Sequence, residues 1–393
     1  MNTTAQLPFE QTHPLQVAPQ LRTLQKQGTA VHRIRTAVGD DAWLVTGHAE
    51  VRQFLDDDRL GRSHPHPEAA ARTGESALFG GPLGNFDTED ADHARLRSLL
   101  RPHFTPGRMR ALRPRVDALA AGLLDALAAA GPPADLHADL ALPLPILVIG
   151  ELLGVPDEDR DSFHAWSEAA ADVSDRARSE HGVGELFNYS LQLIARKRQR
   201  PGDDVLSRLA ATEGVSDTEA AELSVMLLFA GHETTVFQIG IGALHLLTNP
   251  EQWQALRDNP GLLPNAVEEI LRAPTRSGGG AIPRYARTGV DVDGVTIHAG
   301  DLVLLEIGAA NHDDAVFADP DRFDLTRSAA QQLSFGYGAH YCIGALLARI
   351  ELQAVFAQLA QRFPDLRPAV DIDELTMHRN VLIGGLTALP VQW

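Results

Sequence analysis

Apolar and polar residues alternate in the N-terminal part of the chain, which indicates β-structure. The segment VHRIRTAVGDDAWLVTG, residues 31–47, alternates on both sides of a Gly-Asp-Asp turn and predicts two antiparallel strands. HAEVRQFL, residues 48–55, has helical spacing instead. Residues 61–92 are rich in Gly, Pro and polar side chains. They predict a long loop, of the kind that forms lids or binding segments.

Helical spacing dominates from about residue 93 to Arg272. A glycine-rich break at residues 277–283, SGGGAIP, opens a short β region, in which Asp293-Gly294 predicts a hairpin turn. The chain returns to helix after Cys342. No linker, internal repeat or low-complexity block separates these parts.

We therefore expect one mainly α domain over residues 1–393. A β-rich portion, about residues 1–60, should pack on a larger helical body.

One predicted helix is unusually long. Ser216 and Glu219 form a capping box, and apolar residues continue until Asn249-Pro250. Its length of roughly 30 residues would cross an entire domain, and its apolar character all round predicts burial. Its middle reads AGHETT, residues 230–235, and an acid with two threonines is unfavourable in a buried helix. Such conflicts concentrate at functional sites.

The net charge of −18 argues against general nucleic-acid binding, because phosphates would repel the protein. Residues 93–116 are an exception, with seven arginines and no acidic residue. They form either a solvated helix face or a docking patch for an anionic group or acidic partner. The N-terminus lacks the pattern of a signal peptide, and the most apolar segment, residues 140–150, is too short to span a membrane. With a single cysteine, we expect a cytoplasmic protein without a membrane partner.

Cys342, the only cysteine, lies in FGYGAHYCIG, residues 335–344. A helix begins next to it, and the free N–H groups of a helix N-terminus favour a thiolate, the form that binds metals. The glycines permit positive φ and close approach to a large flat group, and Phe335 could shield the sulfur. A lone cysteine is more often a small buried core residue, and a redox or nucleophilic role is a further alternative.

FGYGAHYCIG resembles the haem-binding signature of the cytochrome P450 family. Its fixed positions match at Phe335, Gly336, Gly338, His340, Cys342 and Gly344. The resemblance covers nearly the whole chain. It implies the cytochrome P450 fold, with a long central distal helix and small β-sheets, and haem b as cofactor. It also implies that Cys342 is the metal ligand, the axial thiolate of the haem iron.

AGHETT resembles the oxygen-activation motif of the same family, with Ala230, Gly231, Glu233, Thr234 and Thr235 at matching positions. By this resemblance Ala230 and Gly231 leave room for O₂. Thr234 offers a hydroxyl for hydrogen bonding and Glu233 relays protons, so these two are the catalytic residues that we expect. A threonine inside a helix can instead hydrogen-bond to its own helix.

Further segments resemble supporting parts of the family. Glu269 and Arg272 match a Glu-x-x-Arg pair, and Arg322 in PDRF matches the third member of a buried ionic network. The resemblance also implies four cations that bind the haem propionates, although each could be an ordinary surface cation: His93, Arg97, Arg284 and His340. Two segments depart from the family pattern. They are Asn311-His312-Asp313, and the three glycines of residues 278–280, which suggest a reshaped pocket.

The resemblance implies a monooxygenase that inserts one oxygen atom from O₂ into a lipophilic small molecule. The glycine-rich segment and the Pro-Arg-Tyr-Ala that follows resemble members that oxidise terpenoid lactones or macrolide polyenes. The chain has no G-x-G-x-x-G nucleotide-binding motif and no cysteines for an iron–sulfur cluster. We therefore expect electrons from a ferredoxin and its reductase. A peroxide-driven peroxygenase and a non-catalytic partner protein of the same fold are the alternatives.

Overall fold

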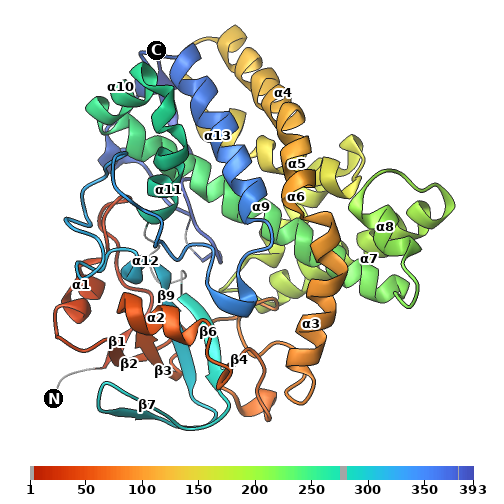
Figure 1. Ribbon diagram of the computed structural model, residues 1–393, viewed down its shortest axis with the longest axis vertical. Coiled ribbons are helices and arrows are strands. Elements are labelled where there is room, and N and C mark those ends of the chain that lie inside the picture. The colour runs from red at the N-terminus through yellow and green to blue at the C-terminus, as the bar shows by residue number, and fades with distance from the viewer. Residues whose placement is uncertain (1–3, 275–280, 379) are drawn as a thin grey trace.

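A six-stranded sheet, two smaller sheets of three and two strands, and a much larger helical body make up the described structure (Figure 1). The computed structural model describes residues 4–274, 281–378 and 380–393. The helices are α1 (Pro19–Gln25), α2 (His48–Phe54), α3 (Glu89–Leu100), α4 (Pro106–Ala130), α5 (Pro143–Leu153), α6 (Arg160–Ala170), α7 (Arg176–Gln199), α8 (Val205–Ala211), α9 (Asp217–Leu247), α10 (Pro250–Asp258), α11 (Leu263–Arg272), α12 (Ile307–Ala310) and α13 (Ala345–Arg362). The prediction of a mainly α fold is confirmed.

The strands are short. They are β1 (Ala5–Gln6), β2 (Val31–Arg35), β3 (Asp41–Val45), β4 (Leu60–Gly61), β5 (Ala134–Asp135), β6 (Ala281–Ala286), β7 (Val290–Val292), β8 (Val295–Ile297), β9 (Leu302–Glu306), β10 (Arg367–Pro368) and β11 (Pro390–Gln392). The largest sheet has the order β1-β2-β3-β9-β6-β4. Strands from residues 281–306 thus complete the sheet that the N-terminal portion begins.

Both predicted hairpins are present. β2 and β3 pair antiparallel, with Val31 opposite Val45 and Arg35 opposite Asp41. β7 and β8 flank Asp293 and Gly294, whose φ values of 54° and 74° are those of a tight hairpin turn. The three glycines of residues 278–280 lie outside the described residues.

The predicted loop of residues 61–92 is shorter than expected, because α3 already begins at Glu89. The buried Glu89 carboxylate accepts hydrogen bonds from the backbone N–H groups of Arg62 (2.8 Å) and Ser63 (3.0 Å). Burial opposes ionisation of this carboxyl, but the hydrogen bonds outweigh it and lower its pKa to about 2. Glu89 therefore holds the start of the loop against the first turn of α3.

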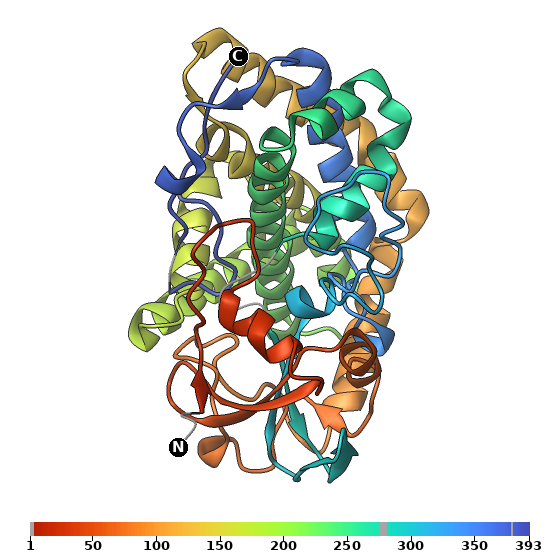
Figure 2. The ribbon, with the colours of Figure 1, turned by 90° about the vertical axis from the view of Figure 1, so that its left-hand side faces the viewer.

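Helix α9 runs through the middle of the helical body (Figure 2). Its 31 residues span about 46 Å, and it packs against α5, α7, α11 and α13. Ser216 caps its N-terminus by accepting a hydrogen bond from the N–H of Glu219, as the sequence predicts. The reciprocal half of the capping box is not formed, because the Glu219 carboxylate accepts two hydrogen bonds from Arg95 (2.6 and 2.9 Å). Among the described helices, none is both long and apolar enough to cross a membrane.

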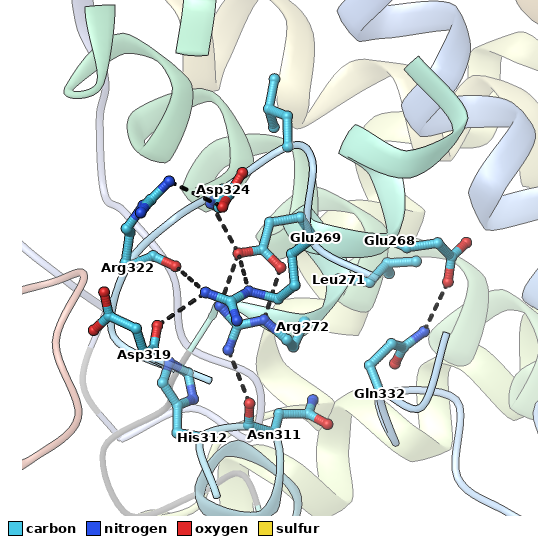
Figure 3. Close-up of polar contacts among 12 residues, drawn as sticks. Glu268, Glu269, Leu271, Arg272, Asn311, His312, Asp319, Arg322, Asp324 and Gln332 are labelled. Carbon is cyan, nitrogen blue, oxygen red and sulfur yellow. Dashed lines mark hydrogen bonds and ion pairs between the residues drawn. The ribbon is translucent and has the colours of Figure 1, made fainter. Parts of the chain in front are cut away.

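A buried ionic network surrounds Glu269 and Arg272 of α11 (Figure 3). Glu269 and Arg272 are both fully buried and form two hydrogen bonds, at 2.7 and 2.8 Å. Arg272 also donates to the carbonyl of Asn311 at 2.9 Å. The Asn311 side chain in turn donates to the hydroxyl of Ser334 at 2.9 Å, one residue before Phe335. The network therefore connects α11 to residues 335–344, which we call the cysteine loop.

The third member of this network is Arg327, and the prediction of Arg322 is wrong. Nε of Arg327 lies 3.2 Å from the Glu269 carboxylate. Arg322 is largely exposed and pairs with Asp324 at 3.0 Å instead. Its backbone carbonyl accepts a hydrogen bond from Arg327 at 2.9 Å. The chain after Arg322 curls back, so that the side chain five residues later reaches Glu269.

Candidate active site

A cavity lies between the middle of α9 and the cysteine loop. Its walls combine the two motifs that the sequence singles out, more than one hundred residues apart. They include Ala230, Gly231, Thr234 and Thr235 from α9, and Phe335, Cys342, Gly344 and Leu347 from the cysteine loop and α13. The fold therefore brings the cysteine and the threonines to opposite sides of one space.

The cysteine loop is shaped by backbone conformation. Gly336 and Gly338 have φ values of 70° and 68°, which side chains other than glycine rarely adopt. The N–H of Cys342 donates to the carbonyl of Phe335 at 2.9 Å and closes the loop. Gly344 has an ordinary φ of −84° and forms the N-cap of α13. The expectation of positive φ thus holds for Gly336 and Gly338 but not for Gly344.

Cys342 lines the cavity and is exposed to that space, while protein atoms surround its sulfur on the other sides. Burial raises the pKa of its thiol, while the N–H groups of Gly344 and Ala345 partly oppose that effect. The predicted helix N-terminus is therefore present at the sulfur. Binding of a metal cation would supply the remaining driving force for deprotonation.

Phe335 is held in place by the start of α13. The guanidinium carbon of Arg349 lies 4.5 Å from the centre of the Phe335 ring. Arg349 also forms two hydrogen bonds with Glu268 of α11, at 2.6 and 3.0 Å. These contacts tie the aromatic wall of the cavity to the same helix that carries the Glu269–Arg272 pair.

Basic side chains, arginines and histidines, gather at one edge of the cavity on the side of Cys342, and we call them the cation cluster. The four that the sequence predicts lie near one another, and the structure adds Arg62, which the sequence analysis missed: Arg62, His93, Arg97, Arg284 and His340. The rings of His93 and His340 lie 3.9 Å apart, centre to centre. Burial, with neighbouring cations, lowers the pKa of His340 to about 3 and that of Arg284 to about 10.

Arg284 lacks the counter-charge that a buried guanidinium requires. It is 4% exposed, and its Nη1 donates to the carbonyl of the preceding residue, Pro283, at 2.9 Å. Within the described part of the chain, no carboxylate forms an ion pair with it. A buried charge beside like charges is costly without an anion, so this cluster is built to bind one.

On the opposite side, the two threonines hydrogen-bond to their own helix. Thr234 donates its hydroxyl to the carbonyl of Ala230 at 2.9 Å, and Thr235 donates to that of Gly231 at 3.4 Å. The alternative that the sequence left open for Thr234 is therefore present in the structure. Its hydroxyl oxygen still lines the cavity and keeps lone pairs that accept hydrogen bonds. A side chain at Gly231 would come within 2.8 Å of Ile149, so this glycine also permits close packing of α5.

Glu233 is absent from the described lining of the cavity. Its carboxylate lies 3.3 Å from Nδ1 of His232 and close to His164 of α6. Burial opposes ionisation, but contact with His232 and the charges of nearby histidines lower its pKa. Thr234 and Glu233 are adjacent in the chain but lie in different surroundings.

The sequence analysis also missed two polar groups in the cavity wall. Glu351 of α13 is buried, and its Oε2 has no hydrogen-bond partner among the described residues. Oε1 of Gln238 on α9 likewise has no partner in the part of the chain that the structure describes. Burial raises the pKa of Glu351 well above its usual value. The available signal was an acid on the apolar face of a helix, with Leu347 four residues before it and Val355 four residues after it.

Comparison with known proteins identifies the family. The family model described as Cytochrome P450 matches residues 185–384. Pentalenolactone synthase from Streptomyces exfoliatus is 43% identical, over 100% of both chains. The mycinamicin IV hydroxylase/epoxidase of Micromonospora griseorubida is 40% identical, over 98% of each. The substrate-free structure of PimD, a polyene macrolide antibiotic pimaricin epoxidase, is 36% identical, superposes with a TM-score of 0.89, and both chains are covered in full. The chain belongs to the cytochrome P450 family.

Cytochromes P450 carry haem b bound through a thiolate, and the residues of this P450 fit that cofactor. Haem b has two propionate carboxylates on one edge, and among the described residues no carboxylate pairs with Arg284 in the cation cluster beside Cys342. The departure at Asn311-His312-Asp313 does not disturb the P450 scaffold. His312 is buried with Nδ1 2.9 Å from the Gly308 carbonyl, and Asp313 accepts a hydrogen bond from the N–H of His48 at 2.8 Å.

Proposed function

We propose that this P450 inserts one atom of O₂ into a lipophilic natural product, by hydroxylation, epoxidation or a related oxidation. The observation that carries the proposal is the placement of Cys342, at the N-terminus of α13, across one cavity from Thr234. Haem b, when bound, supplies the iron that binds and activates O₂. The protein supplies the sulfur ligand, the cations that hold the propionates, and the groups that move protons.

Cys342 is the proposed iron ligand. The N–H groups of Gly344 and Ala345 stabilise negative charge on its sulfur, and Phe335 lines the same cavity, where it could shield the sulfur from water. Arg284, with His93, Arg97, His340 and Arg62, would bind the propionates by charge-assisted hydrogen bonds. Haem b would thus be held through its propionates by the cation cluster and through its iron by Cys342.

Thr234 and Glu233 are the proposed proton-delivery residues. Because Thr234 donates to the Ala230 carbonyl, its oxygen is oriented with its lone pairs available to accept a hydrogen bond from a bound water. Glu233, ionised in its buried setting, would exchange protons with the histidines beside it. Proton transfer to the cavity then requires a water that bridges the Glu233 side and the Thr234 side of α9.

A second cavity supports the proposal that the substrate is lipophilic. It has a volume of about 560 Å³ and reaches Phe237 of α9, three residues after Thr234. Its apolar lining includes Phe9, Leu375, Met377, Leu382 and Ile383, beside polar residues such as Thr12, His13 and His378. Relatives named for pentalenolactone, mycinamicin and pimaricin chemistry suggest a substrate of terpenoid-lactone or macrolide type.

A ferredoxin and its reductase are the proposed electron source. Within residues 93–116, several arginines are paired, such as Arg95 with Glu219 and Arg115 with Glu151. In the described structure, three others are exposed and form no ion pair: Arg101, Arg108 and Arg110. They flank Phe104, which lines the haem cavity, so an acidic protein bound there would lie close to the iron. The single domain over residues 1–393 and the cytoplasmic location stay predictions from the sequence.

The absorption spectrum of the reduced carbon monoxide complex tests the central assignment. Haem-reconstituted protein should show the red-shifted band of thiolate ligation, and Cys342→Ser should lose it while the neighbouring Tyr341→Phe keeps it. Absence of the band in the unaltered protein, or its persistence in Cys342→Ser, would overturn the proposal.

A further inference from the structure

Two histidines and one carboxylate lie close together where α6 meets α9. None of the three is in the described lining of the haem cavity. Ligand atoms of His164, His232 and Glu233 lie within 4.8 Å of one another. His164 comes from α6, and the other two are successive residues of α9. The rings of His164 and His232 are nearly perpendicular, at 87°, with centres 5.5 Å apart. Two helices thus converge on one point with three groups that bind metals.

The hydrogen-bonding state of these groups calls for a ligand. His232 is 0% exposed, and its Nε2 has no hydrogen-bond partner among the described residues. Its Nδ1 lies 3.3 Å from the Glu233 carboxylate, without the geometry of a hydrogen bond. Nδ1 of His164 is also buried, and no described residue is its hydrogen-bond partner. Leaving a buried polar atom unpaired costs about 1–3 kcal/mol. A cation bound between the carboxylate of Glu233 and one nitrogen of each histidine would give these buried groups a partner.

We propose that His164, His232 and Glu233 bind a divalent transition metal, Zn²⁺, at a site separate from the haem iron. Two imidazoles and one carboxylate form a common donor set for zinc, with a fourth position left for water or another ligand. Bond lengths of about 2.0–2.2 Å require the donors to approach one another by rotamer adjustments from their present spacing. His137, whose Nδ1 is buried and unpartnered near Glu233 and His164, is the candidate for the fourth position.

Occupancy of this site would regulate the enzyme. Glu233 precedes Thr234, and this consequence rests on the proposed role of Glu233 in proton delivery. A zinc-bound carboxylate no longer exchanges protons freely, so Zn²⁺ should lower the yield of product per electron pair. The metal itself takes no part in the oxidation.

Zinc binding is measured on the haem-loaded enzyme, first dialysed against a chelator and then titrated with ZnCl₂ by calorimetry. We expect His164→Ala to bind one equivalent less, or to bind that equivalent on the order of a hundredfold more weakly. His164 belongs to α6, so its truncation changes no residue of the AGHETT segment itself. His181→Ala, an exposed histidine on the neighbouring α7, is the matched control and should bind as the unaltered protein does.

X-ray absorption at the zinc edge should show nitrogen and oxygen ligands at about 2.0–2.2 Å. Equal zinc binding by His164→Ala and the unaltered protein would overturn the proposal. So would an ordered water that alone satisfies the His232 nitrogens in zinc-saturated crystals. Failure of the proposed function is distinguishable, because it appears in the carbon monoxide spectrum and does not alter the zinc titration.

Discussion

Nε of Arg327 donates a hydrogen bond to the carboxylate of Glu269 at 3.2 Å, although 58 residues separate the two in the chain. Arg327 is 9% exposed, and it also donates to the backbone carbonyls of Asp319 and Arg322, each at 2.9 Å. It therefore holds the loop before the cysteine segment onto α11. Arg322 pairs with Asp324 in solvent and makes no comparable connection.

Replacement of the two arginines should separate these roles. Arg327→Met removes one partner of a buried carboxylate and should lower the free energy of unfolding by about 3 kcal/mol. Arg322→Met removes an exposed pair and should cost less than about 1 kcal/mol. Urea unfolding followed by tryptophan fluorescence measures both. Equal effects would show that Arg327 is not the structural member of the network.

Arg284 should slow the release of haem from the loaded protein. It should not stabilise the apoprotein. Hydrogen bonds to charged groups contribute about 1.5–3 kcal/mol, so Arg284→Gln should release haem roughly tenfold faster. Transfer of haem to apomyoglobin measures that rate. Arg287→Gln is the control, because Arg287 already has two carboxylate partners, Glu89 and Asp90. The apoprotein of Arg284→Gln should be at least as stable as the unaltered apoprotein, since an unpaired buried charge is gone.

The hydroxyl of Thr234 should control coupling. In Thr234→Ala the oxygen that accepts a hydrogen bond in the cavity is lost, so NAD(P)H consumption should continue while hydrogen peroxide replaces much of the product. Thr234→Ser retains the oxygen and should stay coupled. The ratio of product to NAD(P)H consumed, measured with ferredoxin and reductase, tests whether the Thr234 hydroxyl controls coupling. Full coupling in the alanine variant would reject the role of Thr234.

Charge reversal of Arg101 and Arg108 should slow reduction by ferredoxin. Repulsion of an acidic partner should lower the association rate on the order of tenfold at low salt, and the effect should shrink as salt is added. Reduction by dithionite should be unchanged. Arg200→Glu, an exposed reversal at the end of α7, is the control. Equal loss of ferredoxin-driven and dithionite-driven reduction would contradict docking. Faster turnover with peroxide than with ferredoxin would favour the peroxygenase alternative.

Local sequence rules were sufficient where one segment determines its own conformation. Gly336 and Gly338 have the positive φ that the motif requires, and Ser216 caps α9. The local rules failed where a side chain distant in sequence competes for the same hydrogen bonds. Glu219 could complete the capping box, but Arg95 binds it, and nothing near Glu219 in sequence reveals Arg95.

The same limit applies at the active site. The sequence placed Glu233 and Thr234 together, but the surroundings of Glu233 depend on how α6 packs against α9 and which histidine that packing delivers. Arg62 joined the cation cluster because Glu89 holds its backbone, and that contact joins a loop to a helix. Such tertiary contacts leave no periodic trace in the chain.

Two buried histidines should make the protein acid-sensitive below neutral pH. His245 stacks on Phe323 with ring centres 4.8 Å apart, and Nδ1 of His312 lies 2.9 Å from the Gly308 carbonyl. Burial, with nearby positive charge, lowers the pKa of each from 6.5 to about 3. Between these values the unfolded chain binds protons that the folded protein does not, so stability falls as pH decreases from 6.5 toward 3.

Each of these histidines contributes a slope of up to about 1.4 kcal/mol per pH unit within that window. His245→Leu keeps an apolar side chain beside Phe323 and should reduce the slope by about one proton. Urea unfolding of the two proteins at several pH values from 5 to 8 measures it. Between pH 7 and 8 their responses to pH should be parallel, because unfolded histidine is already neutral there. Parallel responses down to pH 5 as well would show that His245 titrates alike in the folded and unfolded states.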